Sequence, residues 1–133
     1  MFADGIRSAL ADHDSIEVLG TVNNGTQLLS FMEKEPADVI LLDINMPEMN
    51  GIDAAKLLAK KFPTVKIIML SMYLEKQFIE ELIKLGVSGY ILKNTGIKEL
   101  EQAILTVAEG KKYFSVDVAL KMIGEQTNAN GSR

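Results

Sequence analysis

Three polar residues that suit phosphate chemistry each stand at the end of a short apolar run: Asp43, Ser71 and Lys93. A carboxylate that attacks phosphorus needs a metal to neutralise charge, and fixed donors for the equatorial oxygens. An ammonium and a hydroxyl are such donors. Taken singly, each residue is better explained as a turn, strand-end or surface residue. Together they indicate a site where Asp43 accepts a phosphoryl group.

The segment after Asp43 is rich in turn-forming residues. Pro47 fixes one backbone dihedral, and Gly51 permits a conformation that other residues avoid. We expect these two residues to shape a loop that holds a backbone carbonyl toward a metal ion.

The elements that must position these residues follow an α/β pattern. Short apolar runs alternate with longer stretches of helical period, as in a parallel sheet covered by helices. Ligands of such sheets bind outside the carboxyl ends of the strands. The second and third runs are apolar throughout, which predicts central strands. The predicted strands are residues 17–22, the weakest, then 38–43, 66–71 and 89–93.

Helices are predicted where apolar residues recur at spacings of three and four. Asn24 and Gln27 resemble a capping box, and Gly86 and Gly110 stand where left-handed caps belong. A sixth helix is expected to begin after Ser115. The apolar stripes of the first five are Phe2, Ile6, Ala9 and Leu10; Leu28, Leu29 and Met32; Ile52, Ala55, Ala59 and Phe62; Phe78, Leu82 and Leu85; and Ile97, Leu100, Ile104 and Val107.

Composition narrows the class of protein. The length of 133 residues and the 47% hydrophobic content fit one domain with its own core. Without cysteine there is no disulfide or thiolate metal site, so we expect a cytoplasmic location. A net charge of -4 argues against direct nonspecific binding to nucleic acid. We find no signal peptide and no membrane-spanning run.

Several motifs at characteristic spacing resemble one family. Residues 41–47 (LLDINMP) with Asn50 and Gly51 resemble the phosphorylation loop of the receiver domains of bacterial two-component response regulators. Ser71 after an apolar strand, and residues 89–93 (GYILK), match the family's remaining landmarks. The resemblance implies a flavodoxin-like, doubly wound parallel sheet flanked by helices, for which the general rules of α/β folds name a chemotaxis receiver as an example.

The resemblance also implies a role for each residue. Asp43 would be the phosphoacceptor, and would hold Mg²⁺ together with the backbone carbonyl of Asn45. Lys93 and Ser71 would pair with the phosphate, and Ser71 with Tyr90 would form the switch that reports phosphorylation. Without the resemblance, Tyr90 is better explained as a half-buried core aromatic.

The resemblance extends to a subfamily. Lys93, Asn94 and Thr95 resemble receivers that precede a LuxR/NarL-type helix-turn-helix output domain, which this sequence does not include. We therefore expect a receiver domain over residues 1–112 and a helical linker with a loose tail over residues 113–133. The implied partners are a sensor histidine kinase, a second copy of the chain in a homodimer, and DNA only through an output domain. No membrane partner is expected.

One departure from the family affects these expectations. Receivers begin with an apolar central strand that ends in two acidic residues, whereas here Met1 leads straight into the first helix. The resemblance thus implies a sheet without its first strand, and weak Mg²⁺ binding. We expect the gap to be closed by residues 18–22 pairing with the strand at 39–42, or by a second chain.

Two alternatives compete with a phosphorylation switch. An aspartate-nucleophile phosphatase of the haloacid dehalogenase kind needs a second aspartate two residues after the nucleophile, where this chain has Asn45. We therefore do not expect an enzyme. The other alternative is a degenerate receiver that serves only as a dimerisation or interaction module, which the missing acidic pair favours.

Overall fold

The computed structural model describes residues 7–11, 13–22, 24–44, 51–72 and 76–120. Its centre is a parallel four-stranded sheet in the order β1-β2-β3-β4. The strands are β1 (Val39–Asp43), β2 (Lys66–Ser71), β3 (Gly89–Leu92) and β4 (Tyr113–Phe114). The last three predicted strands are therefore confirmed to within a residue at each end. Of the two strands predicted to be central, β2 is central, whereas β1 stands at the edge of the sheet among the described residues, because an apolar run indicates cover on both faces and not a partner strand on both sides.

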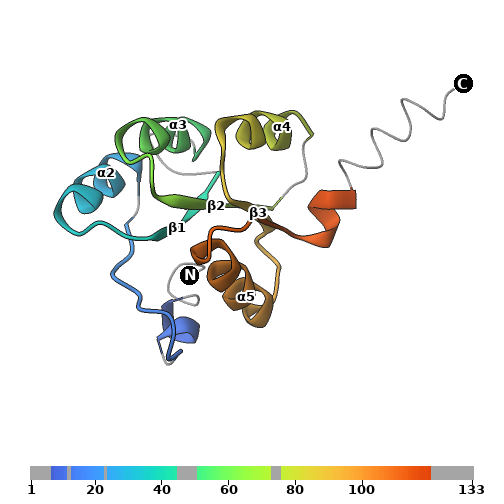
Figure 1. Cartoon of the computed structure of the whole chain (residues 1–133), viewed down its shortest axis with the longest axis horizontal. Coiled ribbons are helices and arrows are strands. Elements are labelled where there is room, and N and C mark those ends of the chain that lie inside the picture. Colours follow the sequence, from blue (N-terminus) through green and yellow to red (C-terminus); the bar gives the residue numbers. More distant parts are fainter. Residues whose placement is uncertain (1–6, 12, 23, 45–50, 73–75, 121–133) are drawn as a thin grey trace, which may run out of the picture.

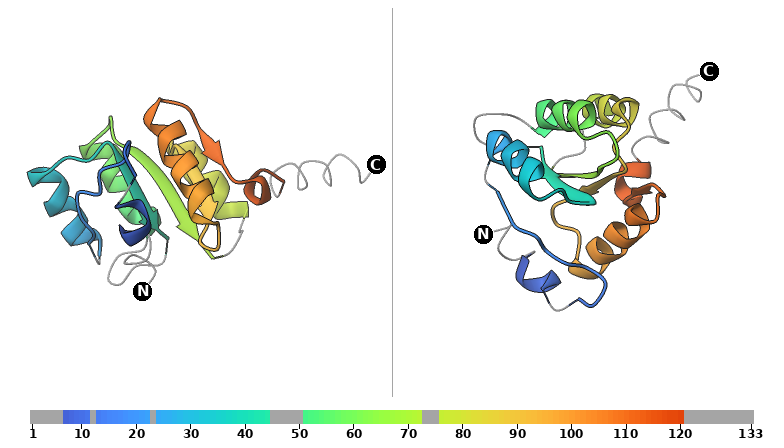
Figure 2. Two further views of the ribbon diagram at one scale, coloured as in Figure 1. Left: turned by 90° about the horizontal axis from the view of Figure 1, so that it is seen from below. Right: turned by 60° about the vertical axis from the view of Figure 1, so that its left-hand side comes forward.

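Four helices flank the sheet, three on one face and one on the other (Figure 1). On the first face lie α2 (Gly25–Lys34), α3 (Gly51–Lys61) and α4 (Lys76–Leu85); α5 (Ile97–Ala108) lies on the second. The rotated views keep the sheet between these two helical layers (Figure 2). Residues 7–10 are also helical, on the α5 side. All five helical stripes thus fall at least partly in helices, and Phe2 and Ile6 of the first stripe lie outside the described residues.

Each face of the sheet has its own hydrophobic core. Successive side chains of a strand point to opposite faces of the sheet. In β1, Ile40 and Leu42 pack on the side of α2 and α3, whereas Val39 and Leu41 pack on the side of α5. The four apolar residues 67–70 of β2 are at most 4% exposed. The continuous apolar run of β2 is therefore explained by burial on both faces.

The helix ends that the sequence predicts are present. The side-chain oxygen of Asn24 accepts a hydrogen bond from the backbone N–H of Gln27 at 2.9 Å, which caps α2. Gly86 after α4 has a φ of 99°, and Gly110 after α5 has a φ of 93°. Both glycines take the left-handed conformation that ends a helix at low steric cost.

The predicted strand at residues 17–22 is wrong. These residues have no regular secondary structure, and within the described chain they do not pair with β1. Val18 packs against the α5-side core and Val22 against the opposite one. A strand is stable only with a hydrogen-bonded partner. Residues 17–22 instead form an irregular connection that packs against the core on one face of the sheet and then against the core on the other. The proposed pairing of residues 18–22 with β1 is therefore also wrong.

Strand β4 was not predicted from the sequence. Tyr113 pairs with Gly89 and Phe114 with Tyr90, and helix 116–120 follows directly. A Cβ on Gly89 would lie 2.8 Å from the carbonyl oxygen of Tyr113, so the bare glycine lets β4 approach. The helix predicted after Ser115 is present, and its continuation to Ile123 lies outside the described residues.

None of the helices described is long and apolar enough to span a bilayer.

Candidate functional site

The carboxyl ends of three strands bring the predicted phosphate-site residues together. Asp43 is the last residue of β1, Ser71 is the last of β2, and Lys93 directly follows β3. The Lys93 ammonium forms an ion pair with the Asp43 carboxylate. The side chains of Asp43 and Lys93 are 27% and 16% exposed, so the ion pair is partly buried but still in contact with solvent.

The backbone ladder fixes the relative positions of these residues. Asp43 lies opposite Leu70 and Ser71 opposite Leu92, so the three strands end at one level. The N–H of Lys93 donates to the carbonyl of Ser71 at 2.8 Å. Ser71 is only 4% exposed. Ser71 is therefore held at a rigid strand end, on the strand that lies between those of the two charged residues.

Gly51 is needed here for a reason other than the predicted one. The described glycines with positive φ are Gly86 and Gly110, so an avoided backbone conformation is not the reason. Instead, a Cβ on Gly51 would collide with the carbonyl oxygen of Asp43 and lie 2.6 Å from the Cα of Ile44. The N–H of Gly51 also donates to the Ile44 carbonyl at 2.6 Å. The first residue of α3 thus packs directly on the end of β1.

Tyr90 is placed differently from the charged pair. Its side chain is fully buried in the core beneath α3 and α4, rather than half-buried as its strand position alone indicated. Met69 lies in that same core, and by strand alternation Ser71 projects to that face too. Tyr90 and Ser71 thus share a side of the sheet. Asn45 and Pro47 lie outside the described residues.

The donor set for a divalent cation is small. Within the described ranges, no three His, Cys, Asp or Glu side chains come together as a metal cluster. Asp43 offers one carboxylate, already beside the Lys93 ammonium. Mg²⁺ is usually bound through one or two carboxylates, with waters and phosphate oxygens completing its octahedron. The described residues therefore fit a site that would bind Mg²⁺ weakly and would need waters and phosphate oxygens as its other ligands.

A cavity of about 40 Å³ adjoins Lys93 on the α5 side of the sheet. This volume exceeds what one water needs, although the walls are mostly apolar. It is lined by Leu70, Ile91, Leu92, Lys93, Thr95, Ile97 and Leu100.

The segment that carries β4 contributes contacts that sequence reasoning missed. The Tyr113 hydroxyl donates to a carboxylate oxygen of Glu99 at 2.8 Å. Burial, and secondarily this bond to Glu99, raises the pKa of Tyr113 from 10.0 to about 12. The Lys112 ammonium donates to the carbonyls of Val87 at 3.1 Å and Gly86 at 3.4 Å, beyond the end of α4. The only local sequence signal for β4 is its pair of aromatic residues, Tyr113 and Phe114, which favour strands weakly.

Comparison with known protein families shows to which family the chain belongs. Residues 1–105 match the family described as the response regulator receiver domain. The chain belongs to this family. It is a receiver domain of the kind used in two-component signalling, and its parallel sheet flanked by helices is the receiver's flavodoxin-like fold.

Two relatives of this receiver are regulatory proteins. One is the transcriptional regulatory protein DegU of Brevibacillus brevis, 34% identical over 125 residues, which cover 94% of this chain and 53% of that protein. The other is the transcriptional regulatory protein MctR of Rhizobium johnstonii, 38% identical over 123 residues, which cover 92% of this chain and 58% of that protein. The receiver thus spans little more than half the length of these relatives.

A solved receiver has a similar structure. The isolated REC domain of RcsB from Salmonella enterica serovar Typhimurium, determined in the presence of the phosphomimetic BeF3-, has a TM-score of 0.80 and 28% identity. The match covers 87% of this chain and 86% of that one. The similarity extends over most of both receivers.

Proposed function

We propose that this receiver is a phosphorylation switch whose phosphoacceptor is Asp43. The observation that carries the proposal is the Lys93–Asp43 ion pair at the carboxyl edge of the sheet, with Ser71 on the strand between them. An ammonium and a hydroxyl beside one carboxylate supply the donors that a transferred phosphoryl group needs.

The chemistry is one displacement at phosphorus. A carboxylate oxygen of Asp43 forms the new bond to phosphorus, and the bond to the donor's leaving group breaks, with the electron pair departing on that group. The product is an acyl phosphate. Lys93 then pairs with phosphoryl oxygens in place of the free carboxylate, and Ser71 donates its hydroxyl to another oxygen.

Magnesium fits this site as a weakly held cofactor. Asp43 and the Asn45 carbonyl would hold it, and it would neutralise charge between the carboxylate and the phosphoryl oxygens. Because Asp43 is the one carboxylate that the described residues place at the site, most of its ligands would be waters and the phosphate itself.

The signalling partners follow from the family. A sensor histidine kinase would supply the phosphoryl group, and a change around Ser71 and Tyr90 would alter contacts within a homodimer. We further propose control of transcription, through an output domain that would contact DNA, because both relatives are named as transcriptional regulatory proteins. No catalytic turnover is proposed, since Asn45 replaces the acid/base aspartate of the related phosphatase chemistry. The cytoplasmic location stays a prediction from composition.

The experiment is labelling of the full chain with acetyl phosphate and Mg²⁺, followed by intact-mass analysis. We expect one added phosphoryl group on the wild-type chain and none on Asp43→Asn. The matched control is Asp38→Asn, which changes an exposed aspartate directly before the other end of β1 and should label normally. A phosphoryl mass that persists in Asp43→Asn would refute the assignment.

A further inference from the structure

We propose that the cavity beside Lys93 binds a short-chain alkyl carboxylate, with the carboxylate of the ligand on the Lys93 ammonium and its alkyl tail inside the cavity. This cavity of about 40 Å³ is here called the α5-side cavity. The binding site stands on the described residues alone. Its effect on phosphorylation rests on the proposed function.

The strand register places the α5-side cavity under the ion pair between Asp43 and Lys93. Leu41 and Ile91 pack in the core on the α5 side of the sheet. Because side chains alternate, Asp43 and Lys93, each two residues later, project to that side as well. Leu70 lies opposite Asp43 in one ladder and opposite Ile91 in the other. The ion pair therefore passes over Leu70, which lines the cavity.

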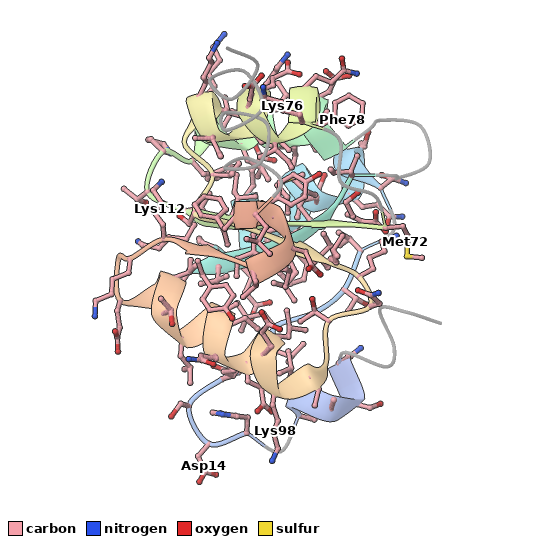
Figure 3. The ribbon with its side chains drawn as sticks, turned by 90° about the vertical axis from the view of Figure 1, so that its right-hand side faces the viewer. Asp14, Met72, Lys76, Phe78, Lys98 and Lys112 are labelled. Atoms are coloured by element: carbon pink, nitrogen blue, oxygen red, sulfur yellow. The ribbon has the colours of Figure 1, made fainter. Side chains whose placement is uncertain are left out.

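The walls of the cavity come from packed elements. Leu70 of β2, Ile91 of β3 and Leu100 of α5 are each at most 4% exposed. Ile97, the first residue of α5, also lines the cavity and is half-buried. Figure 3 shows α5, marked by Lys98, below the sheet, and Met72 marks the carboxyl edge of the sheet. An alkyl tail would thus contact side chains held by both layers.

The chemistry of these walls favours an apolar group over water. A water molecule needs about 10–15 Å³ and two to four polar partners. The volume is sufficient, but among the lining residues only Lys93 and Thr95 have polar side chains. A water deep in the cavity would therefore leave hydrogen bonds unmade, whereas an alkyl group there loses none and leaves bulk water.

Lys93 determines the charge of the ligand. Its ammonium has three N–H donors and no acceptor, and its side chain is 16% exposed. The ammonium already pairs with one carboxylate, that of Asp43. A ligand carboxylate at the mouth of the cavity would make the same kind of charge-assisted bond while its tail enters the apolar walls. Neutral or cationic ligands would forgo that bond.

A bound carboxylate would oppose phosphorylation of Asp43. It takes up the ammonium that otherwise pairs with phosphoryl oxygens, and it puts a second negative charge beside the nucleophile. Phosphoryl donors are themselves anions, so the bound ligand would slow their reaction. The α5-side cavity would make the receiver sensitive to small carboxylic acids.

The test is a titration of the full chain with sodium butyrate at constant ionic strength, followed by methyl NMR. We expect shifts of the methyl signals of Leu70, Ile91 and Ile97. The dissociation constant should be on the order of millimolar, because a ligand of so few atoms has a low ceiling on affinity. The absence of these shifts at saturating butyrate would overturn the site.

Two control ligands separate the charge of butyrate from its tail. Butyramide keeps the tail and has no charge, whereas formate keeps the charge and has no tail. Each should bind at least about tenfold more weakly than butyrate. Equal affinity for butyramide would overturn the role of Lys93, and equal affinity for formate would overturn the role of the cavity.

Enlarging the cavity should change the preferred tail length. In Leu100→Ala, hexanoate should bind more tightly than butyrate, by about fourfold for each additional CH₂ that is buried. The wild-type chain should show no such gain. Leu82→Ala, which truncates a fully buried leucine in the core on the opposite face, should behave as the wild type does. The same preference in Leu82→Ala and Leu100→Ala would overturn the assignment.

A second variant decides the question if Leu100→Ala does not fold. Ile97→Phe adds bulk at a half-buried wall position and should weaken butyrate binding at least about tenfold, because the tail loses its space. Ile83→Phe is the matched control, since Ile83 is half-buried against the core on the opposite face. Unchanged binding in folded Ile97→Phe would overturn the site.

Phosphorylation supplies the last arm, with phosphoramidate as the donor because it releases no carboxylate. Saturating butyrate should slow labelling of the wild-type chain toward the rate of Lys93→Ala, and should leave Ile97→Phe unaffected. Labelling that bound butyrate does not slow overturns the effect on phosphorylation and leaves the proposed function standing. A chain that does not label without butyrate overturns the proposed function, while the titration still decides whether the site exists.

Discussion

The ammonium of Lys93, just after β3, forms an ion pair with the carboxylate of Asp43 at the end of β1, although β2 lies between those two strands. The lysine side chain therefore reaches across the end of β2, where Ser71 stands. A group attached to Asp43 would lie beside the ammonium, next to the strand that ends in Ser71.

Removing this cation should slow phosphorylation of the chain. We expect Lys93→Ala to label with acetyl phosphate at least about tenfold more slowly, because the developing phosphoryl charge loses its paired donor. Lys98→Ala, which removes an exposed lysine on α5, should label at the wild-type rate. Time-resolved intact mass measures both, and wild-type kinetics in Lys93→Ala would reduce Lys93 to a structural partner of Asp43.

Gly51→Ala should destabilise the fold at the junction of β1 and α3. The added Cβ would collide with the Asp43 carbonyl oxygen, so one of the two elements must move. We expect a loss of about 1–3 kcal/mol in the free energy of unfolding, the usual range for overpacking. Gly96→Ala is the matched control, because its Cβ would meet nothing within 4 Å. Urea unfolding compares them, and equal midpoints would contradict this account of Gly51.

The Tyr113–Glu99 bond should be visible in a pH titration. Burial and Glu99 raise the pKa of Tyr113 to about 12, so the folded state favours the neutral phenol. The stabilisation from this shift is present in full below about pH 10, the unfolded pKa of tyrosine, and is lost as the pH rises through about 12.

The measurement is phenolate absorbance, with Tyr113→Phe to identify the step. Glu99→Gln should lower the pKa of Tyr113 only part of the way, because burial is the larger cause and remains. A Tyr113 step at the ordinary pKa of tyrosine in the wild-type chain would mean that neither the burial of Tyr113 nor its bond to Glu99 persists in solution.

Magnesium should bind weakly and through Asp43. One carboxylate provides little of the octahedral shell, so we expect a dissociation constant in or above the millimolar range, about -4 kcal/mol or weaker. NMR titration with Mg²⁺ should shift amides near residues 42–44, and Asp43→Asn should abolish those shifts. Tight binding that survives Asp43→Asn would place the metal elsewhere. Chelation with EDTA should stop labelling by acetyl phosphate.

Local sequence patterns determined most of the elements and the residues that we propose for the phosphate site. The apolar run before Ser71 is buried as a central strand, and the cap at Asn24 needs only residues within one helical turn. The similar run before Asp43 forms a strand, but at the edge of the described sheet. Asp43, Ser71 and Lys93 were predictable as neighbours because parallel strands present their carboxyl ends at one edge.

Only the tertiary structure decided which segments pair and why certain residues are required. Residues 17–22 have strand-like composition but lack a partner strand, whereas two-residue β4 has almost no sequence signal and forms because Gly89 leaves room beside β3. Gly51 was predicted for its backbone freedom, yet it is needed for a contact with Asp43. Strand pairing and close packing depend on groups that are far apart in the chain. Periodicity and propensity are properties of neighbouring residues, so they cannot predict these contacts.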